Sequence, residues 1–286
     1  MVINARGNTV ETITYGGISV INAIPAFLGG TIAIDLKARI IISLNNESKK
    51  CPYNEFVNFI TNYTLKRWNL DLSYNDLCIN VISEIPPTSG LKSNSAIASG
   101  LIYGLAIALG IKISPIDAAR IAAEATKMHG SSITGAFDDA AASILGGLVL
   151  TDNATNSIIK HLNLNDEYIV IITGFKDKKK KLEKIDRLRS LTPIYKEIFN
   201  LALNGDLWRA TIINGILVAE SLGYLDAIPF ISNALIKGAI ASGVSGNGPS
   251  VFAIFKPGEE GPFIDYVEQN WNYYLVTRFV NIRDFD

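Results

Sequence analysis

Cysteine and histidine are scarce in this chain of 286 residues, which contains only two of each. Cys51 and Cys78 are far apart in the sequence and lie outside any C-x-x-C pattern, and His129 and His161 are equally isolated. We therefore expect neither a zinc cluster nor a disulfide framework. The low cysteine content fits a reducing cytoplasm.

An excess of charge of either sign is also lacking. The chain has 26 Lys and Arg residues against 27 Asp and Glu residues, a net charge of −1. This balance gives no basic surface for nucleic acid or an anionic membrane, so we expect neither as a partner. The run from Lys176 to Lys184 contains six lysines, is interrupted by Asp177 and Glu183, and predicts a solvated turn or helix end. Nothing in the composition defines an oligomeric state.

Apolar runs of the membrane-spanning type are missing as well. Residues 16–34 and 93–111 are uncharged, but glycine interrupts both. The first stretch also contains Asn22 and Pro25 and predicts a strand, a loop and a second strand. The small residues of the second stretch predict a helix packed tightly inside a protein. With no signal peptide apparent at the start, we expect a soluble, cytoplasmic protein.

What the chain does contain is a large apolar fraction, 48%, arranged in alternating helical and strand patterns. The predicted strands are 15–24, 30–44, 77–85, 148–151, 168–173 and 251–255. The predicted helices are 53–68, 93–111, 116–127, 137–145, 193–202, 207–222 and 229–241. Because no clean βαβ repeat occurs, these patterns favour a mixed α+β fold. A polar break at 152–157 suggests an N-terminal lobe, 1–155, and a C-terminal lobe, 156–286.

The richest motif lies between a predicted strand and the apolar helix. It reads Pro86, Pro87, Thr88, Ser89, Gly90, Leu91, Lys92, Ser93, Asn94, Ser95 and Ala96. Glycine allows the backbone to approach a ligand, and the free amides and positive dipole end of a helix start favour phosphate. A hydroxyl-rich helix cap that binds nothing is the alternative. A P-loop does not fit, because Leu91 precedes Lys92 where that motif requires glycine.

A second glycine-rich segment runs from Gly243 to Ser250, just before a predicted strand. Its Gly246, Asn247 and Gly248 expose backbone amides, an arrangement that can bind an anion. A tight turn leading into the strand explains the pattern about as well.

Acidic residues form the third motif. Glu124 lies on one predicted helix, and Asp138 and Asp139 begin the next one, which ends at Gly146-Gly147. Carboxylates are the ligands that Mg²⁺ takes in phosphoryl-transfer sites, and a carboxylate can accept the proton of an attacking hydroxyl. The alternative role for the two aspartates is to complement the dipole of the first helical turn.

In this order, the three segments resemble the motifs of the galactose, homoserine, mevalonate and phosphomevalonate (GHMP) kinase superfamily. The segment from Gly90 to Ala96 is similar to the archaeal-type shikimate kinase branch, in which lysine occupies a position that other members give to glycine. Further similarity to that branch covers nearly the whole chain, at Asn22-Ala23, 29–36, 137–140, Asn214-Gly215 and 222–224.

The resemblance implies a two-lobed α+β fold in which ATP and its acceptor meet in the cleft between the lobes. The loop at 86–96 and the Gly246–Gly248 segment would bind the triphosphate, with Ser93 and Glu124 near Mg²⁺. Asn94 departs from the usual serine of the superfamily, so we do not expect this residue to ligate the metal directly.

For the catalytic residues, the resemblance implies Lys92 and one or both of the paired aspartates. Counting back from Gly146-Gly147, the mevalonate kinase pattern favours Asp139 as the base, whereas the homoserine kinase pattern points to Asp138. We keep both and favour Asp139.

The implied reaction is transfer of the γ-phosphoryl group of ATP to the 3-hydroxyl of shikimate. The acceptor carries a carboxylate, and the candidate cations for it are Lys92, Arg187 and Arg189. A homoserine or mevalonate kinase is one alternative, which the lysine in the loop disfavours. A non-catalytic nucleotide-binding relative is another, disfavoured because it would need neither a base nor metal carboxylates.

Overall fold

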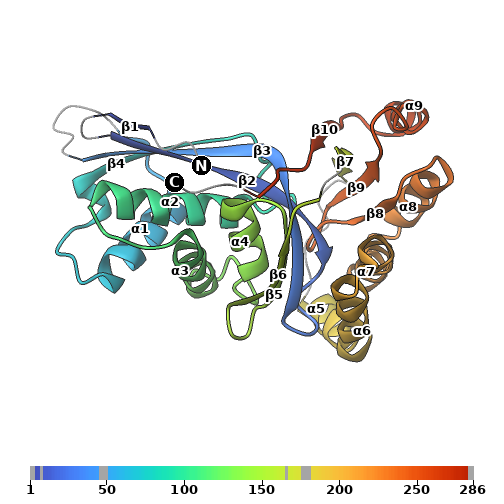
Figure 1. Ribbon diagram of the computed structural model, residues 1–286, viewed down its shortest axis with the longest axis horizontal. Helices are drawn as coiled ribbons and strands as arrows, with labels where there is room; N and C mark the ends of the chain where they lie inside the picture. Colours follow the sequence, from blue (N-terminus) through green and yellow to red (C-terminus); the bar gives the residue numbers. More distant parts are fainter. Residues whose placement is uncertain (1–3, 7–8, 45–50, 165–166, 175–181, 283–286) are drawn as a thin grey trace.

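The first half of the chain forms an antiparallel sheet with helices on one face (Figure 1). The computed structural model describes residues 4–6, 9–44, 51–164, 167–174 and 182–282. The strands of this sheet, in spatial order, are β1 (Asn4–Arg6), β2 (Thr9–Ile21), β3 (Leu28–Leu44), β5 (Leu148–Asp152) and β6 (Ser157–Leu162), with β4 (Leu77–Ser83) also paired to β3. Strand β3 organises the sheet, because β2 follows one of its edges and β5 and β4 share the other.

The helices on that face pack closely because one of them carries small residues. They are α1 (Glu55–Arg67), α2 (Ser93–Ala108), α3 (Pro115–Met128) and α4 (Phe137–Leu145), with the 3-10 helix η1 (Tyr74–Asp76) before β4. The hydroxyls of Thr12 and Thr14 on β2 donate to α2 carbonyls, at 2.8 and 2.7 Å. A Cβ on Gly100 would lie 2.6 Å from the side chain of Ile40. The predicted tight packing of this apolar helix is confirmed.

The second half of the chain forms a smaller antiparallel sheet with its own helices. Its strands, in spatial order, are β10 (Leu275–Arg278), β7 (Ile169–Gly174), β9 (Ser250–Phe255) and β8 (Ala241–Val244). The helices are α5 (Leu182–Arg189), α6 (Thr192–Leu203), α7 (Leu207–Leu222), α8 (Ala227–Ile236) and α9 (Gly261–Asn270). Helix α7 packs against both β8 and β2, so it links this half to the first sheet.

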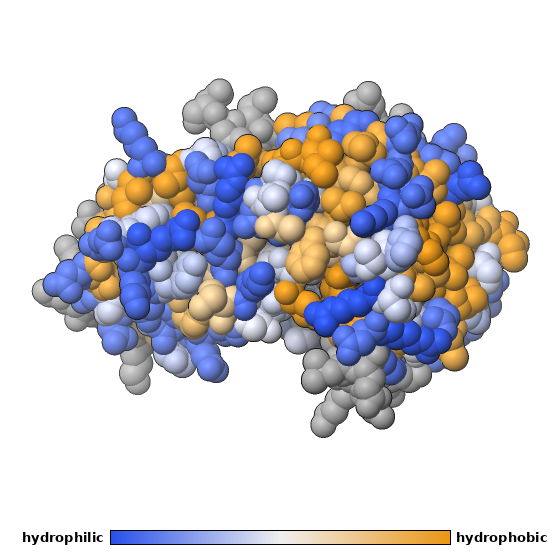
Figure 2. Space-filling model, turned by 90° about the horizontal axis from the view of Figure 1, so that it is seen from below, coloured by the Kyte–Doolittle hydropathy of each residue, from blue (hydrophilic) through white to orange (hydrophobic). Residues whose placement is uncertain are grey.

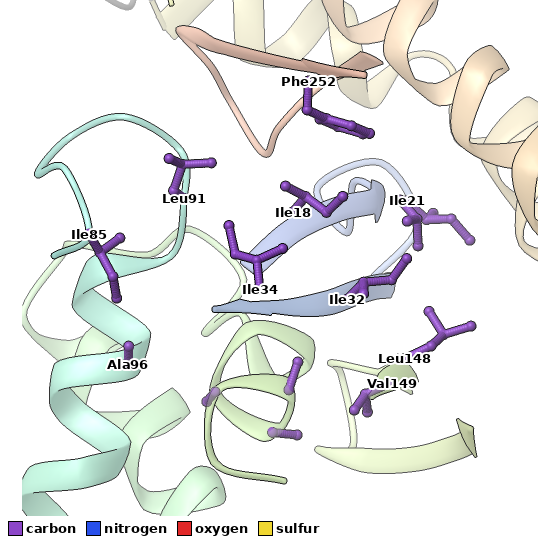
Figure 3. Packing of buried hydrophobic residues seen from close by; sticks show 14 of the residues in the cluster. Ile18, Ile21, Ile32, Ile34, Ile85, Leu91, Ala96, Leu148, Val149 and Phe252 are labelled. Carbon is purple, nitrogen blue, oxygen red and sulfur yellow. The ribbon is translucent and has the colours of Figure 1, made fainter. Parts of the chain in front are cut away.

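The two halves share one hydrophobic interior. Ile18 and Ile34 from the first sheet, Leu91 from the loop before α2 and Phe252 from β9 lie around it (Figure 3). All four side chains are at most 1% exposed. Burying apolar area of this kind stabilises the fold by about 25 cal/mol per Å². The loop before α2 is therefore fixed at the junction of the two halves.

The observed elements confirm the predicted mixed α+β class. Helices α4 and α7 have the predicted bounds, and Ser114 caps α3 with Pro115 in its first turn, as expected. The predicted helix 229–241 is wrong at its C-terminal end, since α8 ends at Ile236 and Ala241 begins β8. Gly238, with a φ of 95°, lies between the two and stops the helix.

Two other predictions concern the boundary between the lobes and the lysine-rich run. The division at 155/156 falls in the turn of the β5–β6 hairpin, so β6 pairs with the first sheet. The division into lobes at that position stays a prediction. Residues 176–181 of the lysine-rich run lie outside the described part of the chain.

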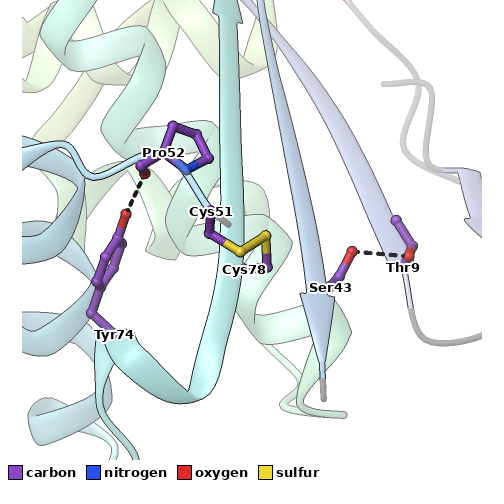
Figure 4. The surroundings of a disulfide bond; sticks show 6 residues. All are labelled: Thr9, Ser43, Cys51, Pro52, Tyr74 and Cys78. Carbon is purple, nitrogen blue, oxygen red and sulfur yellow. Dashed lines mark hydrogen bonds between the residues drawn. A yellow bond between two sulfur atoms is a disulfide. The ribbon is translucent and has the colours of Figure 1, made fainter. Parts of the chain in front are cut away.

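The expectation that the cysteines form no disulfide is wrong, because Cys51 and Cys78 are bonded (Figure 4). Strand β4 pairs with the end of β3, and the segment before α1 passes beside it, which places the two Cα atoms 5.4 Å apart. The hydroxyl of Tyr74 donates to the carbonyl of Pro52 at 2.9 Å and holds the same segment. A cytoplasmic location stays a prediction that the cysteines no longer support, although intracellular disulfides are known in hyperthermophiles.

Replacing both Cys51 and Cys78 with serine is expected to lower the free energy of unfolding by about 3.5 kcal/mol. The bond closes a loop across a sequence separation of 27 residues, and releasing it adds conformational entropy to the unfolded chain. For a chain of this size the change corresponds to a Tm lower by about 6 °C. Thermal unfolding measures it, with dithiothreitol-treated wild type as the matched control. Equal Tm values for oxidised wild type and the double variant would contradict the prediction.

Exposed apolar side chains lie on the helices of the C-terminal half. Ile194, Ile216, Leu225 and Ile236 on and between α6, α7 and α8 are all at least 40% exposed. Hydrophobic residues gather over this end of the molecule in Figure 2. Within the described residues, no helix combines the length and hydropathy needed to cross a bilayer.

Candidate active site

A cavity of about 460 Å³ lies at the junction of the two halves. This volume is within the range of small-molecule sites. The predicted site residues that line it are Pro86, Thr88, Ser89, Gly90, Lys92, Ser93, Asn94, Ser95, Asp138, Asp139, Gly246 and Asn247. Leu91 and Ala96 point into the core instead, and Pro87 and Gly248 are not part of the lining. The structure thus brings parts of all three sequence motifs to one cavity.

The two glycine-rich segments contact each other directly. The hydroxyl of Ser245 donates to the carbonyl of Gly90 at 2.9 Å, and the amide of Ser250 donates to the carbonyl of Ser89 at 3.0 Å. Gly90 has a φ of 85°, and a Cβ there would lie 2.4 Å from the carbonyl oxygen of Ser245. Glycine is therefore required at this position by both conformation and space.

The N-terminus of α2 opens onto the same cavity. Lys92 occupies the N-cap position in a left-handed conformation, with a φ of 71°, and no side chain caps the first-turn amides. Uncapped amides at the positive end of a 16-residue helix form a favourable environment for an anion. The hydroxyl-bearing residues Ser93 and Ser95 line the cavity beside them.

At the nucleotide site that the resemblance implies for this loop, Gly90→Ala is expected to raise the KM for ATP at least about tenfold, because the loop must move away from Ser245. The matched control is Gly110→Ala after α2. Gly110 also has a positive φ, 69°, but a Cβ there would meet nothing within 4 Å. Steady-state kinetics on both variants separates the effect of a Cβ clash, present only at Gly90, from the effect of a positive φ, present at both positions. An unchanged KM for Gly90→Ala, or an equal change in both variants, would refute the role of this loop.

A buried ion pair lies on the wall of the cavity. The ammonium of Lys92 is 3.0 Å from Oδ1 of Asp139, and the two side chains are only 7% and 12% exposed. Lys92 also donates to the hydroxyl of Ser19 at 2.5 Å. Within the described residues, Oδ2 of Asp139 accepts no hydrogen bond, so it is free to interact with a molecule in the cavity.

Asp138 lies deeper than its neighbour and is 3% exposed. Its Oδ1 accepts a hydrogen bond from Asn153 at 2.8 Å, and its Oδ2 lies 3.0 Å from the hydroxyl of Thr31. Burial, followed by the charge of Asp139, raises the pKa of Asp138 from its usual value of 3.8 to about 7. Lys92 opposes this shift. The two adjacent aspartates therefore differ sharply in environment.

Comparison with known proteins agrees with this geometry. Residues 55–147 match the model of the GHMP kinases N terminal domain. The chain is 34% identical to the shikimate kinase of Methanocella arvoryzae over 93% of its own length and 92% of that protein. It is also 34% identical to the shikimate kinase of Pyrococcus furiosus, over 83% and 88%.

The chain belongs to the shikimate kinase family of GHMP kinases. Solved structures with the same fold have different names. Methanococcus jannaschii mevalonate kinase superposes with a TM-score of 0.77 at 16% identity, covering 97% of this chain and all of that one. A homoserine kinase from Cytophaga hutchinsonii gives 0.76 at 18% identity, covering 99% and 98%. At these identities the likeness shows the fold alone.

In this shikimate kinase family member, the predicted metal residues are not together. Ser93 lines the cavity, but the carboxylate of Glu124 pairs with Arg67 at 2.7 Å and accepts a weak contact from Tyr63. The described residues contain no cluster of three or more His, Cys, Asp or Glu side chains able to hold a metal. Mg²⁺ needs only one or two carboxylates when phosphate oxygens complete its shell, so the hydroxyl of Ser93 fits the ion, and Glu124 would supply a carboxylate only after leaving Arg67.

Only one of the candidate cations for the acceptor faces the cavity. Arg187 pairs with Glu220 and Arg189 pairs with Asp186, and both arginines are exposed and outside the lining. Lys92 alone of the three lines the cavity. In this shikimate kinase family member, Arg187 and Arg189 therefore form surface ion pairs.

Sequence reasoning missed Thr31, Ser19 and Asn22 as site residues. Thr31 lies on β3, and its hydroxyl contacts both aspartates of α4. Asn22 donates to the carbonyl of Gly246 at 2.9 Å and to Asn247 at 3.0 Å, so it fixes the second glycine-rich segment. The resemblance covered Asn22-Ala23 and 29–36 without giving these residues a role, and a threonine within an isoleucine-rich strand was a further signal. Its partner lies more than 100 residues away, which no local pattern could indicate.

Proposed function

We propose that the protein transfers the γ-phosphoryl group of ATP to the 3-hydroxyl of shikimate in a Mg²⁺-dependent reaction. The observation that carries this proposal is the buried Lys92–Asp139 pair beside the uncapped N-terminus of α2. It combines a carboxylate base, a cation and an anion site in one cavity. The relatives named shikimate kinase, at 34% identity over most of the chain, support the choice of acceptor.

In this mechanism Asp139 is the base. Oδ1 is held by Lys92 and Thr31, at 3.0 and 2.7 Å, which leaves Oδ2 to accept the proton of the 3-hydroxyl. The oxygen of that hydroxyl attacks the γ-phosphorus of ATP, and ADP leaves. The Lys92 ammonium orients the carboxylate and stabilises negative charge that develops on the transferred group.

The triphosphate would lie against the 86–96 loop and the first turn of α2, with Gly246 and Asn247 lining the same cavity. Backbone amides and the hydroxyls of Ser93 and Ser95 would bind its oxygens. Ser93 would ligate Mg²⁺, and Glu124 could join only if its side chain leaves Arg67. The bound ion would neutralise phosphate charge during transfer. Positioning of this kind supplies much of the rate in phosphoryl transfer.

The test is an assay of purified protein with ATP, Mg²⁺ and a panel of shikimate, homoserine and mevalonate. The proposal predicts ADP release with shikimate in strong preference to the other two alcohols. Preferred turnover of homoserine or mevalonate would overturn the substrate and keep the kinase activity. ATP binding with no turnover of any alcohol would instead support a nucleotide-binding relative without catalytic function.

A further inference from the structure

The hydroxyl of Thr31 lies between the two aspartates. Its Oγ1 is 3.0 Å from Oδ2 of Asp138 and 2.7 Å from Oδ1 of Asp139. A hydroxyl has a single hydrogen and can make a full two-centre hydrogen bond to only one of these oxygens. The remaining contact can be a full hydrogen bond only if the carboxyl group of that aspartate carries a proton and donates it to the Thr31 oxygen. One of the two aspartates must then carry a proton.

The surroundings of each carboxyl group indicate which one. Asp139 forms a direct ion pair with the ammonium of Lys92. Asp138 is 3% exposed and has no direct ion pair in the described structure. The charged groups that act on Asp138 are Asp139 on its own helix and Lys92 from the loop before α2. The neighbouring β3 and the turn after β5 contribute only the neutral Thr31 and Asn153.

The orientation of Asn153 identifies the oxygen that holds the proton. Its Oδ1 accepts hydrogen bonds from the hydroxyl of Thr151 at 2.7 Å and from the amide of Asp138 at 3.3 Å. Its Nδ2 must then face Asp138, where it donates to Oδ1 at 2.8 Å. Since Oδ1 of Asp138 is an acceptor, Oδ2 is the atom that can donate to Thr31.

We propose that Asp138 is a neutral carboxylic acid whose Oδ2–H donates to Thr31, so that Thr31 donates to Asp139 and, with Lys92, holds the ionised base facing the cavity. Asp138 is then a positioning residue, and the role of base belongs to Asp139 alone. The inference rests on the proposed function only in giving Asp139 that role. A Cβ on Gly29 would lie 2.6 Å from the carboxyl carbon of Asp138, so glycine there leaves room for the acid.

The arrangement predicts a distinctive pH dependence. Below about pH 7 Asp138 keeps its proton, consistent with its raised pKa. At higher pH Asp138 ionises, and its carboxyl group can no longer donate a hydrogen bond to Thr31. A second negative charge then lies beside the base, Asp139. The kcat/KM of the wild type is therefore expected to fall as pH rises above about 7, since kcat/KM reports groups of the free enzyme.

Asparagine is the neutral isostere of the protonated acid, and its Nδ2 can donate to Thr31. Asp138→Asn is therefore expected to lower kcat less than tenfold and to remove the decline above pH 7. Thr31→Val is expected to lower kcat at least tenfold with little change in KM, and Thr31→Ser should recover most of the loss. Asp265→Asn, an exposed acid on α9, is the matched control.

A measurement without substrate tests the protonation directly. Carbon-13 NMR of aspartate-labelled protein is expected to show one carboxyl carbon that titrates near pH 7 and is absent from Asp138→Asn. If every carboxyl group is ionised from pH 5 upward, the proposal is wrong. A kcat for Asp138→Asn as low as that of Asp139→Asn would also overturn it. Failure of the shikimate assay would leave the titration intact, so the two proposals can fail separately.

Discussion

Asp139→Asn is expected to lower kcat for shikimate phosphorylation by about 10²- to 10⁴-fold, the usual contribution of a positioned general base. The amide has the same shape but cannot accept the proton of the 3-hydroxyl. It also leaves the buried ammonium of Lys92 without its anion, because Oδ1 is the atom 3.0 Å away. Since the binding groups are untouched, the KM for ATP should change little. Steady-state kinetics measures both constants.

The control for this variant is Asp265→Asn, which removes an exposed carboxylate of the same type and should keep full activity. If Asp139→Asn and Asp138→Asn both retain near wild-type kcat, base catalysis by a carboxylate is wrong for this protein. Positioning and electrostatic stabilisation would then have to supply the rate.

Lys92→Met is expected to lower kcat by about 10²- to 10³-fold, the range seen when one donor to the transition state is removed. Methionine keeps the length of the side chain and loses the charge. The carboxylate of Asp139 would remain buried without its cation, so the base would lose the group that orients it. Kinetics at saturating ATP and shikimate measures the effect.

Two further variants make this prediction specific. Lys196→Met removes an exposed lysine of α6 and should leave kcat unchanged. Lys92→Arg keeps the charge but not the point geometry of the ammonium, so an intermediate kcat is expected. A kcat for Lys92→Met within a factor of three of the wild type would show that the ion pair is not part of the mechanism.

Local patterns in the sequence predict seven of the nine described α-helices and the position of the loop before α2, but not α5 or α9. The Ser114-Pro115 start of α3 and the glycine pair after α4 are signals that act within a few residues, and the structure confirms both ends. The short strands β6, β8 and β10 were not predicted as separate strands. Each is four to six residues long; β10 forms because it pairs with the distant β7, whereas β6 and β8 are the short partners of β5 and β9 in adjacent antiparallel pairs.

The site features that the sequence did not predict depend, like β10, on contacts between residues that are distant in the sequence. The Cys51–Cys78 bond depends on the pairing of β4 with β3, and the role of Thr31 depends on α4 packing beneath β3. Glu124 lies on the predicted helix, but the partner of its carboxylate, Arg67, comes from α1. Sequence spacing predicts which residues carry chemistry. Tertiary contacts decide which atoms those residues face.

The central claim is that one cavity holds the triphosphate at the N-terminus of α2 and the acceptor hydroxyl at Asp139. A crystal structure with shikimate and a non-hydrolysable ATP analogue tests it most directly. We expect phosphate oxygens within hydrogen-bond distance of the amides at 93–95, and the 3-hydroxyl within about 3 Å of Oδ2 of Asp139. Phosphates bound away from that helix start, or a different acceptor group facing Asp139, would contradict it.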